Sequence, residues 1–156
     1  MNVLVLSTLQ IAQIEAEGAQ TYPNECCGII IGRDVADERT TRRIVERLEP
    51  MQNVFDAQQQ KRRFAVDPLG LMRAEKSAAA AGQMVLGFYH SHPDHPARPS
   101  EYDREHAWPF YSYIIVSIAN GQPVDMTSWL LDDSTQTFSK QEIEENQNGE
   151  TRNQNQ

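Results

Sequence analysis

Apolar residues recur along this chain with two periods, one typical of helices and one typical of strands. Residues 7–20 place apolar side chains at helical spacing, with Ser7 or Thr8 as the N-cap and Gly18 as the end. Residues 68–81 form an alanine-rich run opened by an Asp-Pro pair, a combination typical of a first helical turn. The pattern therefore predicts two helices before residue 82.

Short apolar runs bounded by glycine or polar residues predict strands between and after these helices. The predicted strands cover residues 27–32, 39–48, 64–66, 84–89, 113–118 and 124–131. A polar loop is expected over residues 51–63 and a short helix over residues 100–106. Because strands and helices are interleaved, the fold class is predicted as α/β or α+β with a mixed sheet.

Chain length and the polar C-terminal segment define the expected domain. A length of 156 residues favours one domain around one core. From Gln141 onward the sequence is rich in Glu, Asn and Gln and contains almost no apolar residues, a composition typical of disorder. We therefore expect a single domain over residues 1–139 and a disordered polar tail over residues 140–156.

Charge and composition exclude several classes of protein. Lys and Arg total 14 against 22 Asp and Glu, and the resulting formal charge of -8 repels the phosphate backbone of nucleic acids. No apolar run approaches the roughly 20 residues that span a bilayer, and the first ten residues lack the basic start of a secretory signal. Cys26 and Cys27 are adjacent, so they cannot join distant segments, and two free thiols favour a reducing compartment. A cytoplasmic location without nucleic-acid or membrane partners is expected.

Two histidines at the end of a predicted strand are the first sign of chemistry. His90 and His92 are two residues apart, so their side chains point to the same face of the strand. Asp103 follows eleven residues after His92, at the start of the predicted short helix, and the intervening loop is long enough to bring it back. Two imidazoles and a carboxylate suit Zn²⁺, and a catalytic zinc site uses three protein ligands.

Amide hydrolysis at such a metal also needs groups that move a proton and stabilise negative charge. Glu25, just before the predicted buried strand, is the candidate general base, and Ser100 is the candidate oxyanion donor. The Ser-x-x-Asp sequence over residues 100–103 is also a capping box, which begins a helix without any catalytic role. The two interpretations are compatible, because a capped turn holds a ligand rigidly.

These residues together resemble a known family. Residues 90–103 read His-Ser-His, seven further residues and Ser-x-x-Asp, and residues 23–28 read Pro-Asn-Glu-Cys-Cys-Gly. This arrangement resembles the JAMM (MPN+) metalloproteases, and the resemblance runs from about residue 7 to residue 138. It implies a curved mixed sheet flanked by helices, similar to the architecture of cytidine deaminases. It also implies catalytic roles for Glu25 and Ser100, with His90, His92 and Asp103 as the zinc ligands.

The compact chain resembles the stand-alone prokaryotic branch of that family. This resemblance implies a zinc-dependent peptidase or isopeptidase acting after the C-terminal glycine tail of a ubiquitin-like or ThiS/MoaD-like sulfur-carrier protein. Its substrates would include conjugates of such carriers and carriers bearing a C-terminal cysteine adduct. Two alternatives stay open: a non-catalytic interaction module of MPN type, and an amidase acting on cell-wall peptides or other small amides. The sequence does not define the oligomeric state.

Overall fold

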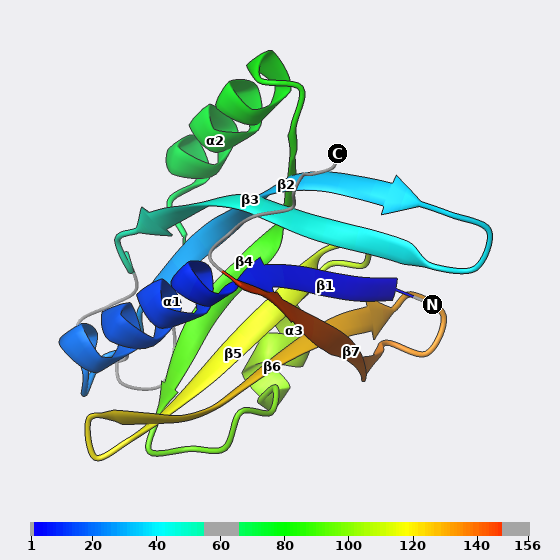
Figure 1. Ribbon diagram of the computed structural model, residues 1–156. Helices are drawn as coiled ribbons and strands as arrows, with labels where there is room; N and C mark the ends of the chain where they lie inside the picture. Colours follow the sequence, from blue (N-terminus) through cyan, green and yellow to red (C-terminus); the bar gives the residue numbers. More distant parts are fainter. Residues whose placement is uncertain (1, 55–65, 148–156) are drawn as a thin grey trace.

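The computed structural model describes residues 2–54 and 66–147, and these residues form a closed barrel with helices packed on its outside (Figure 1). The elements, in chain order, are β1 (Asn2–Ser7), α1 (Thr8–Thr21), β2 (Cys27–Ala36), β3 (Thr41–Met51), α2 (Pro68–Ala80), β4 (Met84–Pro93), α3 (Glu101–His106), β5 (Ser112–Ala119), β6 (Gln122–Asp132) and β7 (Thr137–Asn146). The strand order around the barrel is β1-β3-β2-β4-β5-β6-β7. β1 pairs in parallel with both β3 and β7, and β4 pairs in parallel with β5, whereas the other pairs are antiparallel. The predicted mixed α/β class is thus confirmed.

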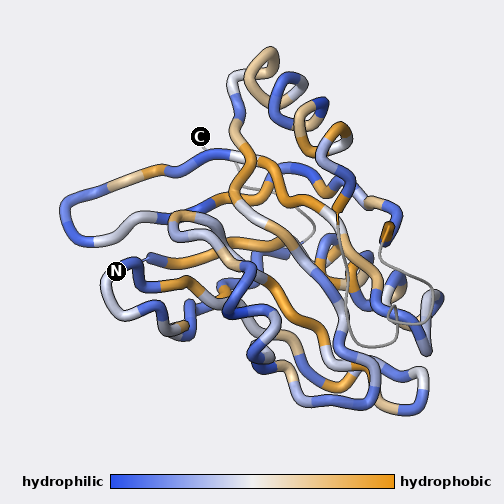
Figure 2. Tube along the Cα trace, turned by 180° about the vertical axis from the view of Figure 1, so that it is seen from behind, coloured by the Kyte–Doolittle hydropathy of each residue, from blue (hydrophilic) through white to orange (hydrophobic). Residues whose placement is uncertain are grey.

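The apolar run in β2 is buried on both of its faces. Ile30 packs with the cluster that includes Leu4 and Ile114, whereas Ile29 and Ile31 pack with alanines of α2. Consecutive strand residues point to opposite faces, so a continuous apolar run is what a strand covered on both sides requires. Figure 2 shows hydrophobic stretches along the central strands. None of the helices in the described part of the chain is long and apolar enough to cross a membrane.

Helix α1 begins as predicted but continues past its predicted end. Ser7 is the N-cap, and its side chain and that of Gln10 form a reciprocal capping box. The helix ends at Thr21 rather than at Gly18, because Gly18 serves packing instead of termination. A Cβ atom at Gly18 would lie 2.9 Å from the Cδ1 atom of Ile118 in β5. The glycine therefore lets the helix lie close against the barrel.

The predicted polar tail is corrected at its start, because residues 140–146 belong to β7. This strand pairs with β6 on one side and with β1 on the other, and it closes the barrel. One of its polar side chains is buried in the barrel: Gln141 is only 3% exposed, accepts from Ser128 and donates to Asn2. Backbone pairing needs few apolar side chains, so composition alone concealed the strand.

Two other expectations differ from the structure or fall outside its described part. Residues 2–7, to which the sequence analysis assigned no element, form β1. The strand predicted over residues 64–66 is not observed at Val66, and residues 64 and 65 lie outside the described residues. Residues 148–156 of the predicted tail lie outside them as well.

A buried arginine ties together three segments of the barrel. Arg43, in β3, is 3% exposed and forms a two-point ion pair with Asp34, with N–O distances of 2.9 and 3.1 Å. Its Nη1 atom also donates to the backbone oxygens of Leu86 and Phe110 and to the hydroxyl of Ser112. The guanidinium lies 4.7 Å from the centre of the Phe110 ring. These contacts fix the loop that leads into β5.

Loss of this arginine should destabilise the protein far more than loss of its neighbour. We expect Arg43→Met to lower the free energy of unfolding by about 3 kcal/mol or more, because Asp34 and three acceptors lose their donor. Arg42→Met is the matched control: Arg42 pairs with Glu144 at the surface, and its loss should cost less than about 1 kcal/mol. Urea denaturation measures both, and equal losses would contradict the prediction.

Candidate metal centre and active site

Strand β4 carries both predicted histidine ligands to one face of the barrel. β4 lies between β2 and β5, and His90 pairs with Cys27 on one side and with Ile115 on the other. The alternation along the strand places His90 and His92 side by side, with their Nε2 atoms 3.2 Å apart. Both imidazoles are buried, at 1% and 7% exposure. The strand therefore presents two ring nitrogens at one point.

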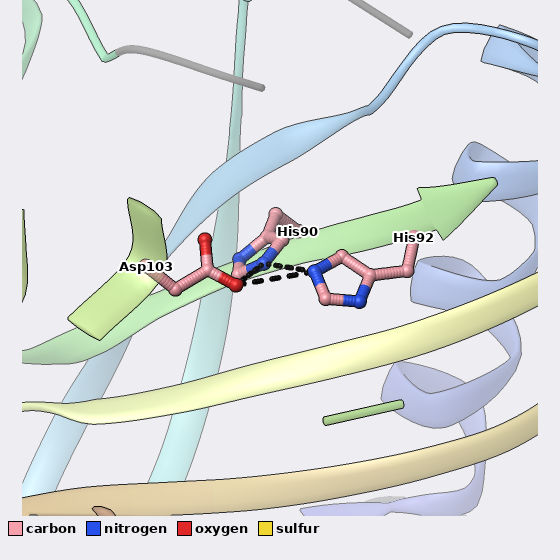
Figure 3. A group of neighbouring side chains, drawn as sticks. All are labelled: His90, His92 and Asp103. Carbon is pink, nitrogen blue, oxygen red and sulfur yellow. Dashed lines mark hydrogen bonds and ion pairs between the residues drawn. The ribbon is translucent and has the colours of Figure 1, made fainter. Parts of the chain in front are cut away.

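Helix α3 brings the carboxylate of Asp103 to the same point (Figure 3). Its Oδ2 atom lies 3.2 Å from Nε2 of His92 and 3.4 Å from Nε2 of His90. Ser100 caps the helix: its hydroxyl accepts from the Asp103 N–H, and its own N–H donates to Oδ2 of Asp103. The capping box and the predicted ligand are thus the same residues, and the cap orients the carboxylate.

The protonation states of these groups suit a metal. Burial lowers the pKa of His90, which favours its neutral form. Burial raises the pKa of Asp103, but its contacts with His90 and His92 and the hydrogen bond from the Ser100 N–H outweigh this effect and hold the pKa of the carboxyl well below its ordinary value. Nδ1 of His92 lies 2.9 Å from the carbonyl oxygen of Pro96, a contact that directs the lone pair of Nε2 into the site.

The donor set fits one divalent metal ion. Ligand atoms of His90, His92 and Asp103 all lie within 4.8 Å of one another. Imidazole nitrogens and a carboxylate are ligand types that bind divalent metal ions in their deprotonated forms. Three protein ligands also leave a coordination position for a further group in a tetrahedral site.

Glu25 lies beside the triad of candidate ligands His90, His92 and Asp103, two residues before β2 begins at Cys27. It is 4% exposed, and its Oε1 atom has no hydrogen-bond partner among the residues that the structure describes. Burial, and next the charge of Asp103, raise the pKa of Glu25 to about 9. The backbone around it is held by Asn53, which donates to the Glu25 carbonyl, and by Ser91, whose hydroxyl accepts from the N–H of Cys26. A buried carboxyl with an unused oxygen is a typical proton-transfer group.

Two cavities of different character adjoin the triad. A polar cavity of about 450 Å³ is lined by Glu25, His92, His95, Pro96, Arg98, Ser100, Glu101 and Tyr102. An apolar cavity of about 260 Å³ contains His90 and Asp103 and is walled by aromatic and aliphatic side chains, among them Phe88, Tyr113 and Phe138. Tyr102 lines both cavities and stacks on His106, with ring centres 4.0 Å apart.

The structure therefore brings all five predicted site residues to one region. Glu25, Ser100 and His92 lie in the wall of the polar cavity, and His90 and Asp103 lie in the wall of the apolar one. Sequence analysis did not identify Arg98 or Tyr102 as cavity residues. Neither belongs to a spaced motif, so no sequence signal pointed to them.

Fold and site together define a small mixed α/β barrel domain with a candidate mononuclear metal centre. The family model of prokaryotic homologs of the JAB domain matches residues 9–132, and the chain belongs to this family. The resemblance to JAMM proteins drawn from the sequence is thereby confirmed.

Two curated relatives are similar over part of the chain. Desampylase of Haloferax volcanii is 38% identical over 96 residues, which are 61% of this chain and 63% of that protein. A probable TtuB-protein conjugate cleaving protease of Thermus thermophilus is 41% identical over 68 residues, 43% of this chain and 45% of that protein. The matched region thus spans less than two thirds of either relative.

Solved structures match over nearly the whole chain. A protein from Desulfitobacterium hafniense has a TM-score of 0.76 and 34% identity, with 94% of each chain covered. A protein from Salinibacter ruber has a TM-score of 0.65 and 36% identity, with 92% of this chain and 90% of that chain covered. The barrel with its flanking helices is therefore a shared fold.

Metal binding should depend on the triad and not on a neighbouring histidine. We expect wild-type protein to bind one Zn²⁺ per chain, and His92→Ala or Asp103→Asn to lower the affinity more than about 100-fold, because each removes a direct ligand. His106→Ala is the control, since His106 contacts Tyr102 and lies outside the triad. Calorimetric titration of chelator-treated protein measures this, and wild-type affinity in His92→Ala would contradict it.

The buried carboxyl of Glu25 should make metal-free protein less stable as pH rises. Its pKa is raised from 4.5 to about 9 on folding, so the cost of ionisation is absent below pH 4.5 and grows up to about pH 9. We expect Glu25→Gln to gain on the order of 2 kcal/mol in unfolding free energy at pH 8 and almost nothing at pH 4.5. Glu101→Gln should give no gain, because a hydrogen bond from Arg104 lowers the pKa of Glu101. Denaturation at both pH values tests this, and a pH-independent gain would refute it.

Proposed function

We propose that this protein is a zinc-dependent peptidase or isopeptidase of JAMM type. The observation that carries the proposal is the position of Glu25, a buried carboxyl with an unused oxygen, beside three convergent ligand atoms. The similarity to a desampylase and to a probable conjugate-cleaving protease supports hydrolysis as the activity. A non-catalytic module would have no use for a complete ligand set next to a costly buried acid.

Different residues of the site would have different roles in amide hydrolysis. His90, His92 and Asp103 would hold the zinc ion. When bound there, zinc supplies Lewis acidity, which polarises a carbonyl group and makes water more acidic. Glu25 would accept the proton from the attacking water and pass it to the leaving nitrogen. Ser100 accepts a hydrogen bond from Asp103, so its own O–H can donate to the oxyanion that develops in the polar cavity.

The proposed substrate is a ubiquitin-like or ThiS/MoaD-like sulfur-carrier protein, cleaved after its C-terminal glycine tail. The relatives named for desampylation and for TtuB-conjugate cleavage support a carrier of this kind. An extended glycine tail also fits the geometry, because the ligand atoms lie between two cavities rather than on an open surface. Glycines allow a close approach of the scissile carbonyl to buried ligand atoms.

Substitution of the two proposed catalytic residues should separate chemistry from metal binding. With a ubiquitin-like carrier fused through its terminal glycine to a reporter, Glu25→Gln should lower kcat about 100-fold to 10,000-fold, the usual contribution of a general base. Ser100→Ala should lower kcat about 100-fold, through loss of one oxyanion donor. Glu101→Gln, in the same cavity but paired with Arg104, should keep wild-type activity. Cleavage is followed by intact mass, with zinc content measured in parallel.

Two outcomes would contradict the mechanism. One is full activity of Glu25→Gln at saturating zinc, which would remove Glu25 from proton transfer. The other is failure of zinc-loaded wild-type protein to cleave any carrier in a panel of ubiquitin-like and sulfur-carrier fusions.

A further inference from the structure

The position of Glu25 orients a substrate across the two cavities. Glu25 lines the polar cavity and does not line the apolar one. A group that protonates the leaving nitrogen must lie within hydrogen-bond reach of that nitrogen. The leaving group therefore occupies the polar cavity, and the acyl side of the substrate extends from the other side of the triad.

The polar cavity holds a cation whose charge is not neutralised by the described residues. The guanidinium of Arg98 makes no ion pair or side-chain hydrogen bond with any residue in the described ranges 2–54 and 66–147. Glu101, the nearby carboxylate in the same lining, is bound by Arg104. In a chain with a formal charge of -8, an exposed cation that lines the polar cavity and has no ion-pair partner among the described residues favours an anionic ligand group there.

The loop that carries Arg98 is fixed by its backbone. Asp94 has a left-handed conformation, with φ of 60°, and its N–H donates to the carbonyl of Ile118. The hydroxyls of Ser117 and Thr127 donate to the carbonyls of His95 and Ala97, at 2.5 and 2.6 Å. These bonds hold the backbone on either side of Arg98, so the point from which its exposed side chain extends into the cavity lining is fixed.

We propose that Arg98 binds the free α-carboxylate of a single C-terminal residue that the enzyme removes from its substrate. This inference rests on the proposed function and adds the residue that recognises such a leaving group. In a terminal residue only the α-carbon separates the leaving nitrogen from the carboxylate. The polar cavity, which both Glu25 and Arg98 line, can therefore hold the nitrogen and the carboxylate together. A lysine side chain of a modified protein presents a neutral alkyl chain at that position and offers Arg98 no partner.

The reaction is a balanced hydrolysis. Water adds to the carbonyl carbon of the penultimate residue, the C–N bond to the terminal residue breaks, and no electrons are transferred. Glu25 moves one water proton to the departing nitrogen. The products are a shortened carrier ending in a carboxylate and a free amino acid, whose carboxylate stays opposite Arg98 until release.

Paired substrates test the role of Arg98. A ubiquitin-like carrier extended by one alanine is prepared as the free acid and as the C-terminal amide, and a third substrate carries the same tail on a lysine side chain. Zinc-loaded wild-type protein should cleave the free acid with a kcat/KM about 10-fold to 100-fold above that of the amide. Arg98→Gln should remove this preference by lowering only the free-acid value. Arg98→Lys should retain part of it, because the charge remains without the two-point geometry.

Matched controls separate the preference for the free acid from an effect of net charge and from an effect on the rate of bond cleavage. Arg39→Gln makes the same change of charge in the β2–β3 connection, away from the cavity lining, and should keep the wild-type preference. In a Glu25→Gln background, calorimetry should show tighter binding of the free acid than of the amide, and Arg98→Gln should abolish the difference.

Each outcome decides the matter. Equal cleavage of acid and amide by wild type, or equal loss of both in Arg98→Gln, overturns the role of Arg98 while leaving the proposed hydrolase intact. Cleavage of the lysine-linked substrate alone overturns the proposed leaving group. If zinc-loaded wild type cleaves none of the three, the proposed function fails and the inference fails with it.

Discussion

The pleat of β4 is the constraint on which the site depends. A shift of one residue in its pairing with β2 and β5 would turn both histidines away from the cavities. The residues on its opposite face are fixed as well: Tyr89 donates to Glu17 at 2.5 Å, and Ser91 accepts from the N–H of Cys26 at 2.8 Å. Since Cys26 follows Glu25 directly, one strand positions the two candidate histidine ligands and, through Ser91, the candidate base.

Arg43 and Glu25 are both buried ionisable residues, but among the described residues one has hydrogen-bond partners that compensate its burial and the other does not. Arg43 donates to five acceptor atoms, so its burial is compensated and its role is to join segments. Glu25 is buried to a similar degree, yet its Oε1 has no partner among the described residues and its pKa is raised. An uncompensated buried acid costs stability, and such a cost persists where the group serves a reaction. The hydrogen bonds of Arg43 stabilise the barrel, which can therefore tolerate the loss of stability caused by burying Glu25.

The sequence predicted most elements and the candidate metal ligands because both have local signals, whereas Glu25 was singled out only through its motif context and Arg98 and Tyr102 were not identified. Apolar runs marked β2, β4 and β5, and the spacing of His90, His92 and Asp103 marked a metal triad before any fold was known. β7 was missed because its pairing is made by the backbone, which leaves no apolar pattern. The end of α1 was misplaced because a glycine that ends a helix and one that packs closely look alike in sequence. Closure of the barrel depends on contacts between the two ends of the chain, and no local signal encodes them.

The loop over residues 94–99 shows how a rigid site can accommodate different substrates. Its carbonyls are held by hydroxyls of β5 and β6, and the Pro96 carbonyl contacts Nδ1 of His92. Because these bonds use the backbone, the side chain at position 98 does not support the loop. Under the role proposed for Arg98, substitution there changes what the polar cavity recognises and leaves the candidate metal ligands in place. On this proposal, specificity for the leaving group can change independently of the candidate metal centre, whose residues β4 and α3 hold in place.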